Sequence, residues 1–139
     1  MKNFKILEHT ADLKIKAFAK DLPALFKNMA QGMFSAAIGG KIKSQRLESK
    51  ERKFTIKAQD YESLLINFLN ELIYLSDVNN EIYLDFEFEK FSDKFLKGTA
   101  YGQPIPESGF KTEVKGATFH NLKIQKTKQG YETTVLFDI

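Results

Sequence analysis

The sequence predicts an α+β fold, a two-layer sandwich in which two amphipathic helices pack on a mostly antiparallel sheet. Two segments carry apolar side chains at helical spacing, and the other apolar segments alternate with polar residues as strands do. The elements follow the order ββαβα and then a run of strands. We find no linker or repeat, so the 139 residues are expected to form a single domain, 1–139.

The two expected helices have clear start and stop signals. Asp21 can cap the first, Pro23 falls in its first turn, and Gly39-Gly40 ends it. Asp60 can cap the second, which covers residues 61–77 before a turn at 78–81. The apolar stripe of the first helix is Leu22, Leu25, Phe26, Met29, Met33, Phe34, Ala37 and Ile38, and that of the second is Leu64, Leu65, Phe68, Leu69, Leu72, Ile73 and Leu75.

The strands are predicted from alternation. Residues 81–91 are the clearest, because their even-numbered apolar positions face one side while Tyr83, Asp85, Glu87 and Glu89 face a wet, acidic one. Residues 94–102 follow as a hairpin partner, and Gly130 fits the left-handed position of a short hairpin loop. The other expected strands are 3–7, 13–19, 53–58, 110–119, 122–127 and 131–139.

The composition excludes several classes of function. There is no cysteine, so disulfides, thiolate metal sites and cysteine catalysis are ruled out, and a reducing compartment fits. The N-terminal stretch lacks the apolar run of a secretory signal, and the most apolar segment, 22–38, is interrupted by polar residues. We therefore expect a cytoplasmic protein. The net charge of +3 permits an anionic partner without requiring one.

Motifs of conventional enzymes are missing. No glycine-rich phosphate loop occurs, and no serine lies in a nucleophile elbow. Residues 41–53 carry six basic and two acidic side chains, which could contact RNA or an acidic protein. A solvated loop is the better interpretation of this segment, because no aromatic residue that could stack on bases occurs in it.

Residues 8–12, Glu8-His9-Thr10-Ala11-Asp12, form a short polar run just before a strand. His9 and Asp12 are close enough in the chain for their side chains to converge across a turn. Taken alone, the run is better explained as a turn in which Asp12 accepts hydrogen bonds from backbone amides.

The C-terminal strand changes this balance. It would bring together the Asp138 side chain and the α-carboxylate of Ile139. If it pairs antiparallel with the strand at 13–19, Asp12 faces Asp138. Such carboxylates repel one another unless a divalent cation (Ca²⁺, Mg²⁺ or Mn²⁺), a shared proton or a lysine such as Lys14 neutralises them. His120, at an expected turn, is of interest only if it lies near His9.

Several segments together resemble the archease family. They are "EHTAD" before a strand, "LFKNMAQGMF", "LLINFLNELIYLSD", "YGQPIP" with "EVKGATFHNLKI", and "GYETTVLFDI", in order from residue 4 to 139. The resemblance implies an accessory protein, not itself an enzyme, of the GTP-dependent RNA ligase that joins 3′-phosphate to 5′-hydroxyl ends in tRNA splicing and RNA repair. Such a protein promotes guanylylation and multiple turnover of the ligase.

The resemblance also implies a divalent cation as cofactor. On this chain the matching metal ligands are Asp12 and Asp138, with the Ile139 carboxylate as companion. The implied partners are the RNA ligase directly, and guanine nucleotide and tRNA or other RNA through it, with no membrane. The candidates for supporting or partner-contacting roles are His9, Glu8, Thr10 and His120.

Two departures from the family pattern stand out. The loop 102–110 lacks the Arg-His pair found in many family members, so no role is assigned to it, and Phe68 replaces a common tryptophan. The alternative functions are an RNA-binding or chaperone-like accessory module without ligase activation, and a metal-dependent hydrolase built on the same acids.

Overall fold

The computed structural model describes residues 3–8 and 12–139. It contains two helices and antiparallel strands, so the α+β class and the predicted order of elements are confirmed. The elements are β1 (Phe4–Glu8), β2 (Asp12–Ala19), α1 (Leu22–Ile38), β3 (Lys50–Lys57), α2 (Tyr61–Asn79), β4 (Glu81–Phe91), β5 (Phe95–Pro104), β6 (Gly116–Thr118), β7 (Gln125–Thr127) and β8 (Gly130–Asp138).

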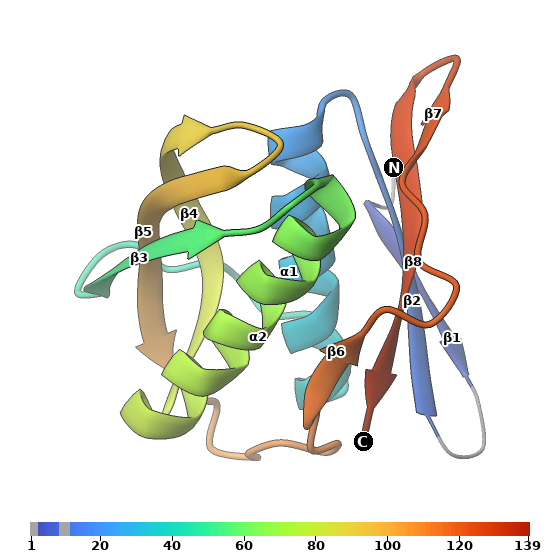
Figure 1. Cartoon of the computed structure of the whole chain (residues 1–139). Helices are drawn as coiled ribbons and strands as arrows, with labels where there is room; N and C mark the ends of the chain where they lie inside the picture. Colours follow the sequence, from blue (N-terminus) through green and yellow to red (C-terminus); the bar gives the residue numbers. More distant parts are fainter. Residues whose placement is uncertain (1–2, 9–11) are drawn as a thin grey trace.

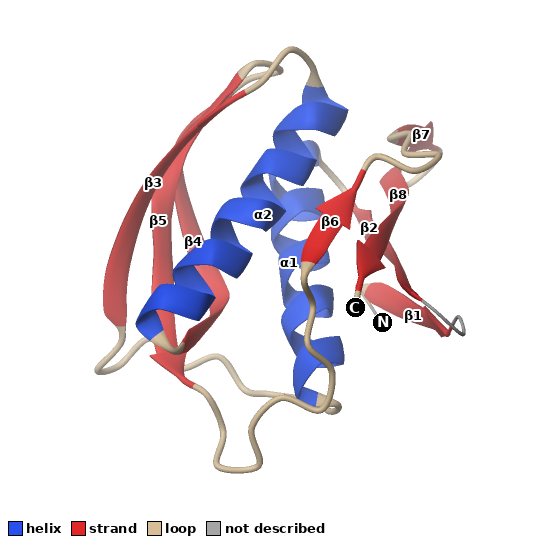
Figure 2. Cartoon of the chain, turned by 60° about the horizontal axis from the view of Figure 1, so that its bottom comes forward, coloured by secondary structure: helices blue, strands red, loops and turns tan. Residues whose placement is uncertain are grey.

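The strands form two sheets where the sequence suggested one. One sheet has the order β1-β2-β8-β6, with β7 also paired to β8, and the other has the order β3-β5-β4. Both helices lie between the two sheets (Figures 1 and 2), so three layers replace the expected two. Each sheet thus buries one face on the helices, which explains why alternation runs through almost every strand.

The helices begin where the caps predict. The carboxylate of Asp21 accepts from the Ala24 amide at 2.9 Å, and that of Asp60 accepts from the Ser63 amide at 2.7 Å. Gly39, with φ of 85°, ends α1 in the left-handed conformation. The second helix runs to Asn79, beyond the predicted end at residue 77, because Asn80 adopts a left-handed φ of 57° and serves as its cap.

Aromatic rings fill the space between the helices and the β3-β5-β4 sheet. Phe68 of α2 is fully buried and lies at the centre of this cluster. Its ring centroid is 5.5–5.9 Å from those of Phe26, Phe54, Phe86 and Phe88. Phe68 thus keeps the centre of the core aromatic.

The predicted strand at 110–119 is wrong over most of its length. Only Gly116–Thr118 pair as a strand. The amides of Lys111 and Thr112 instead donate to the Ala37 carbonyl, at 2.8 and 3.1 Å, and so satisfy the C-terminal end of α1. Their hydrogen bonds are therefore used to cap a helix, and the local alternation of side chains could not show this.

Other strands also begin or end at residues that differ from the predicted ones. In the predicted strand 122–127 only Gln125–Thr127 pair. The Ile124 amide donates to Glu62 at 3.0 Å, so a side chain replaces a neighbouring strand as its partner. The predicted strand 53–58 begins earlier, at Lys50, and the strand predicted at 94–102 continues to Pro104.

The strand β4 departs from simple alternation at one point. Its register against β5 shifts between Tyr83 and Asp85, as in a β-bulge. Tyr83 is consequently fully buried, although the alternation placed it on the wet face. Asp85 and Glu87 lie on the outer face as predicted. Among the described residues, neither helix is both long and apolar enough to cross a membrane.

Candidate functional site

The candidate site lies where β2 begins and β8 ends. These two strands are antiparallel and stay in register from Asp12 opposite Asp138 to Ala19 opposite Tyr131. The antiparallel pairing on which the predicted approach of Asp12 and Asp138 depends is therefore present. The two aspartates therefore come together through eight uninterrupted residue pairs, which fix their relative position.

The Asp12 and Asp138 side chains share one face of the sheet. Directly opposite residues of an antiparallel pair point the same way, with their Cβ atoms about 4.5–5.5 Å apart. The next pair, Leu13 and Phe137, is buried in the core, so the aspartates lie on the face away from the helices. Asp12 is partly buried and Asp138 is exposed. One face of the strand pair thus presents two carboxylates at its end.

Asp138 is held from its other side by β6. Gly116 lies opposite it, and the Lys115 amide donates to the Asp138 carbonyl at 2.8 Å. Asp138 is therefore central in the sheet, between β2 and β6. Ile139, 41% exposed, follows directly.

These residues fit a hard divalent cation in their chemistry. Carboxylate oxygens are the ligands that Ca²⁺, Mg²⁺ and Mn²⁺ prefer. Across the described residues, no group of three or more His, Cys, Asp and Glu side chains is placed to hold a metal. The two aspartate side chains alone are fewer ligands than such a group, so a cation held there would need further ligands from water or a partner. Lys14, two positions after Asp12 on the same face, remains the alternative neutralising group.

The supporting candidates are only partly described. His9 and Thr10 lie outside the described residues. Glu8 ends β1 opposite Leu13, next to the start of β2. His120 is exposed in the turn after β6, beyond the pair Thr118–Leu136 and on the side leading away from Asp138. The structure therefore does not bring His120 to the aspartates. Its Nε2 lies 3.3 Å from the side-chain amide nitrogen of Asn121 instead.

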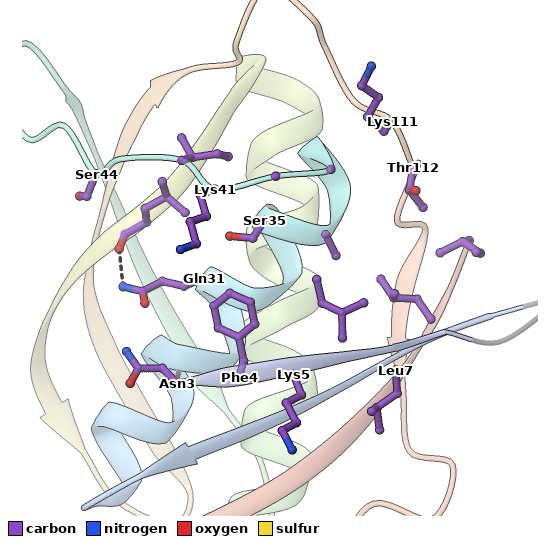
Figure 3. Close-up of a pocket in the computed structure, with 18 of the residues that line it drawn as sticks. Asn3, Phe4, Lys5, Leu7, Gln31, Ser35, Lys41, Ser44, Lys111 and Thr112 are labelled. Carbon is purple, nitrogen blue, oxygen red and sulfur yellow. Dashed lines mark hydrogen bonds between the residues drawn. The ribbon is translucent and has the colours of Figure 1, made fainter. Parts of the chain in front are cut away.

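A groove of about 1160 Å³ adjoins the candidate site. Asp12, Leu13 and Ile139 border it, and α1 lines it with Gln31 and Ser35 (Figure 3). Three lysines that are far apart in the sequence, Lys5, Lys41 and Lys111, also line it. Sequence reasoning missed this groove, because no local pattern connects residues 5, 41 and 111.

The basic segment 41–53 is anchored in part by acidic side chains of β4. Arg46 donates to Asp85 at 2.6 Å and to Glu87 at 3.2 Å, and its guanidinium lies 4.0 Å from the centre of the Tyr101 ring. Hydrogen bonding to Asp85 raises the pKa of Arg46. Arg46, one of two arginines in this segment, is thus engaged by other residues of the protein, which weakens the interpretation of the segment as an RNA-binding surface.

The comparisons with known proteins agree with one another. The sequence profile of the archease protein family matches residues 4–139. The chain is 35% identical over 145 residues to the protein archease of Methanosarcina acetivorans, covering 99% of this chain and 97% of that protein. It is 36% identical over 136 residues to that of Pyrococcus abyssi, covering 94% and 93%.

Solved structures give the same result. The solution structure of protein 1598 of Methanobacterium thermoautotrophicum superposes with a TM-score of 0.73 at 30% identity, covering 100% of both chains. A crystal structure from Thermotoga maritima, described as an archease and possible chaperone, superposes with a TM-score of 0.61 over 97% of this chain and 96% of that one. Because the identity is only 21%, this second similarity shows the fold alone. The profile match over nearly the whole chain, together with relatives above 30% identity, shows that this chain belongs to the archease family.

Proposed function

We propose that this protein activates an RNA ligase that joins 3′-phosphate or cyclic phosphate ends to 5′-hydroxyl ends. In this role it promotes guanylylation of the ligase and supports repeated turnover, and it does not join RNA itself. It acts in the cytoplasm, in tRNA splicing or RNA repair. The observation that carries the proposal is the in-register pair of Asp12 and Asp138 in a chain of the archease family.

A divalent cation is part of the proposal. Asp12, Asp138 and the α-carboxylate of Ile139 would hold it. When bound, the cation neutralises the acids and offers positive charge to phosphate oxygens. The protein's own contribution is rigidity: β2 and β6 flank Asp138 on both sides, so the acids do not need to be ordered when the ligase arrives. Such preorganisation lowers the entropy lost on association.

A guanylylation assay tests this function. The ligase from the same organism is incubated with labelled GTP and a divalent cation, with and without this protein, and covalently bound guanylate is measured. We expect stimulation by the wild-type protein. Asp12→Ala and Asp12→Asn should reduce it by about tenfold or more, a loss typical of damaged metal sites. Asp93→Asn, at an exposed turn remote in sequence from both ends, is the matched control and should stimulate fully.

Circular dichroism must show that the Asp12 variants fold. Full stimulation by folded Asp12→Ala would contradict the role of the acid pair. No stimulation by the wild-type protein, combined with salt-sensitive RNA binding in the absence of ligase, would favour the RNA-binding alternative instead. Turnover of a phosphoester by the isolated protein would favour a metal-dependent hydrolase.

A further inference from the structure

The outermost strand of the first sheet, β1, carries one exposed lysine, Lys5, and otherwise has less protection than the other sheet edges among the described residues. The edge strand β6 has only three residues, and the exposed positions of β3 carry lysines such as Lys53 and Lys57. The edge of β4 is interrupted by its register shift, and its Leu84 carbonyl accepts from Gln31 at 2.9 Å. Short length, lysines, bulges and side-chain cover are the devices that protect edges from strand pairing.

By contrast, β1 presents an exposed apolar edge. Ile6 is 42% exposed and Leu7 is 39% exposed, on opposite faces of the strand. In the described part of the chain, β1 pairs with β2 alone. The inner face of β1 nevertheless packs against α1. A Cβ on Gly32 of α1 would lie 2.9 Å from the Phe4 ring, so helix and strand are in close contact. This edge is therefore rigid and open.

The hydrogen-bonding direction of β1 follows from its register. The Phe18 amide donates to the Asn3 carbonyl at 3.0 Å, so Asn3 and Phe18 form a hydrogen-bonded pair. Hydrogen-bonded pairs alternate with non-bonded pairs in an antiparallel ladder. The backbone N–H and C=O groups of Lys5 and Leu7 therefore also bond to β2. The N–H and C=O groups of Phe4 and Ile6 then point away from β2. They offer two donors and two acceptors to an incoming strand.

The groove beside this edge is lined by apolar side chains and three lysines, and Asp12 borders it as an acidic residue. Asn3 and the β1 residues Phe4 to Leu7 border it along one side, and Ile42 and Leu84 contribute apolar surface on the other. Figure 3 shows Phe4 and Lys41 reaching into the groove, with Lys5 on the other side of β1. Lys111 lies at its far end. Lys14 of β2 lies beside β1 on the outer face of the sheet, and Lys16 on the same face is paired with Glu132 at 2.9 Å.

We propose that an extended acidic segment of a partner protein adds to β1 as a fifth, hydrogen-bonded strand in the row β6-β8-β2-β1. Backbone hydrogen bonds to Phe4 and Ile6 supply affinity, and alternate apolar and acidic side chains meet the groove and its lysines. The proposal rests on the proposed function for the existence of a protein partner and deepens it by naming where the partner docks. A second copy of this chain fits less well, because the Lys5 of its own β1 would face these lysines.

The test uses a short end-blocked peptide in which glutamate alternates with valine, and a matched peptide in which lysine replaces glutamate. Binding to the full-length protein is followed by amide chemical shifts and hydrogen exchange. The acidic peptide should slow exchange of the Phe4 and Ile6 amides and leave the Lys5 and Leu7 amides, which already bond to β2, unchanged. The lysine peptide should bind about tenfold more weakly or worse, since like charges oppose association.

Ile6→Pro separates strand addition from simple charge attraction. Proline removes an N–H that points outward, so it is compatible with an edge strand and with the β1–β2 ladder. It should weaken binding of the acidic peptide by about tenfold, whereas Ile6→Val, which keeps the N–H, should bind within about twofold of the wild type. Unchanged amide shifts at Lys14 and Lys16 check that the ladder survives.

A second test changes the charge of the groove without altering the strand. It uses the double variant Lys41→Glu and Lys111→Glu. The double variant should bind the acidic peptide about tenfold more weakly and show a smaller dependence on salt. Three results would overturn the proposal: no binding of the acidic peptide, preferential binding of octauridylate that Ile6→Pro leaves unchanged, or a dimer in solution that Ile6→Pro dissociates. None of these depends on ligase stimulation, so this surface and the proposed function can fail separately.

Discussion

Glu81 shows how a single buried carboxylate can be kept charged. It is 8% exposed and accepts from Arg52 at 3.0 and 2.9 Å and from the Tyr83 hydroxyl at 2.9 Å. Burial alone would raise the pKa of Glu81, but the hydrogen bonds from Arg52 and Tyr83 outweigh it and lower that pKa. Gly102 permits this arrangement, since a Cβ there would lie 2.3 Å from the Glu81 carboxylate.

The lowered pKa of Glu81 predicts how stability depends on pH. A carboxyl with a lower pKa in the folded state stabilises the fold above its unfolded pKa of about 4.3, and this contribution disappears as pH falls through the folded value. Glu81→Gln should therefore lower the free energy of unfolding at pH 7 by roughly 1–3 kcal/mol, because Arg52 keeps donors without an ionised acceptor. At pH 3 the difference from the wild type should shrink. Urea unfolding at the two pH values measures both.

Glu107→Gln, in an exposed loop, is the matched control and should leave stability within about 0.5 kcal/mol at both pH values. A Glu81→Gln variant as stable as the wild type at pH 7 would show that the ion pair contributes nothing net. This outcome is physically possible, because desolvation can cancel the attraction in a buried pair.

At the scale of elements, the loop between α1 and β3 is held across the outer face of the second sheet. The Gln103 side chain accepts from the Gln45 amide at 2.9 Å and donates to the Lys43 carbonyl at 3.0 Å. Arg46 adds its contacts to Asp85 and Tyr101. Gln103 and Tyr101 are consequently 5% and 9% exposed, although they belong to the face away from the helices. The loop covers part of a face that would otherwise be wet.

Arg46→Lys should loosen this loop. Lysine keeps the charge but cannot reach two carboxylates while stacking on a ring, so these contacts depend on the guanidinium. We expect the Gln45 amide to exchange its hydrogen about tenfold faster than in the wild type, measured by NMR. Lys53→Arg on β3 is the control. Equal protection of Gln45 in the two variants would mean that Gln103 alone holds the loop.

Predictability differs between elements for physical reasons. The helices could be predicted closely, because their caps and apolar stripes are local: Asp21, Asp60 and Gly39 act within one turn of the helix they delimit. The segment around Lys111 could not, since its amides bond to the Ala37 carbonyl, far away in the sequence. Likewise, nothing near Tyr83 in the chain indicates the register shift that buries it.

At the scale of the molecule, the number of sheets was not predictable from the sequence. Alternation shows that a strand has one buried face, but not which strands share a sheet. Here β2 pairs with β8 and β3 with β5, and helices fill the space between the two groups. The Asp12–Asp138 pair could be anticipated because it requires only one pairing. The groove could not, since it combines β1, α1, β4 and two loops.

The Asp12–Asp138 pair predicts that cation binding and folding are linked across the whole molecule. The aspartates belong to strands near the two ends of the sequence, so they lie together only in the folded chain. A cation held between them binds the folded state alone. It should stabilise the protein by about 2.7 kcal/mol at a concentration one hundred times its dissociation constant. Thermal unfolding with Ca²⁺, Mg²⁺ or Mn²⁺, against chelator and against KCl of equal ionic strength, measures this stabilisation.

Asp138→Asn separates this linkage from general salt effects. The substitution removes one of two charges that repel each other in the absence of a cation, so the variant in chelator should be at least as stable as the wild type. It should also lose the stabilisation by divalent cations, because a neutral amide is a weaker ligand. A stabilisation of the same size in Asp138→Asn and wild type would place the cation elsewhere. The wild type could instead unfold at the same temperature in chelator and in saturating divalent cation. That result would show that another group neutralises the pair, and Lys14 is the nearest candidate along the strand.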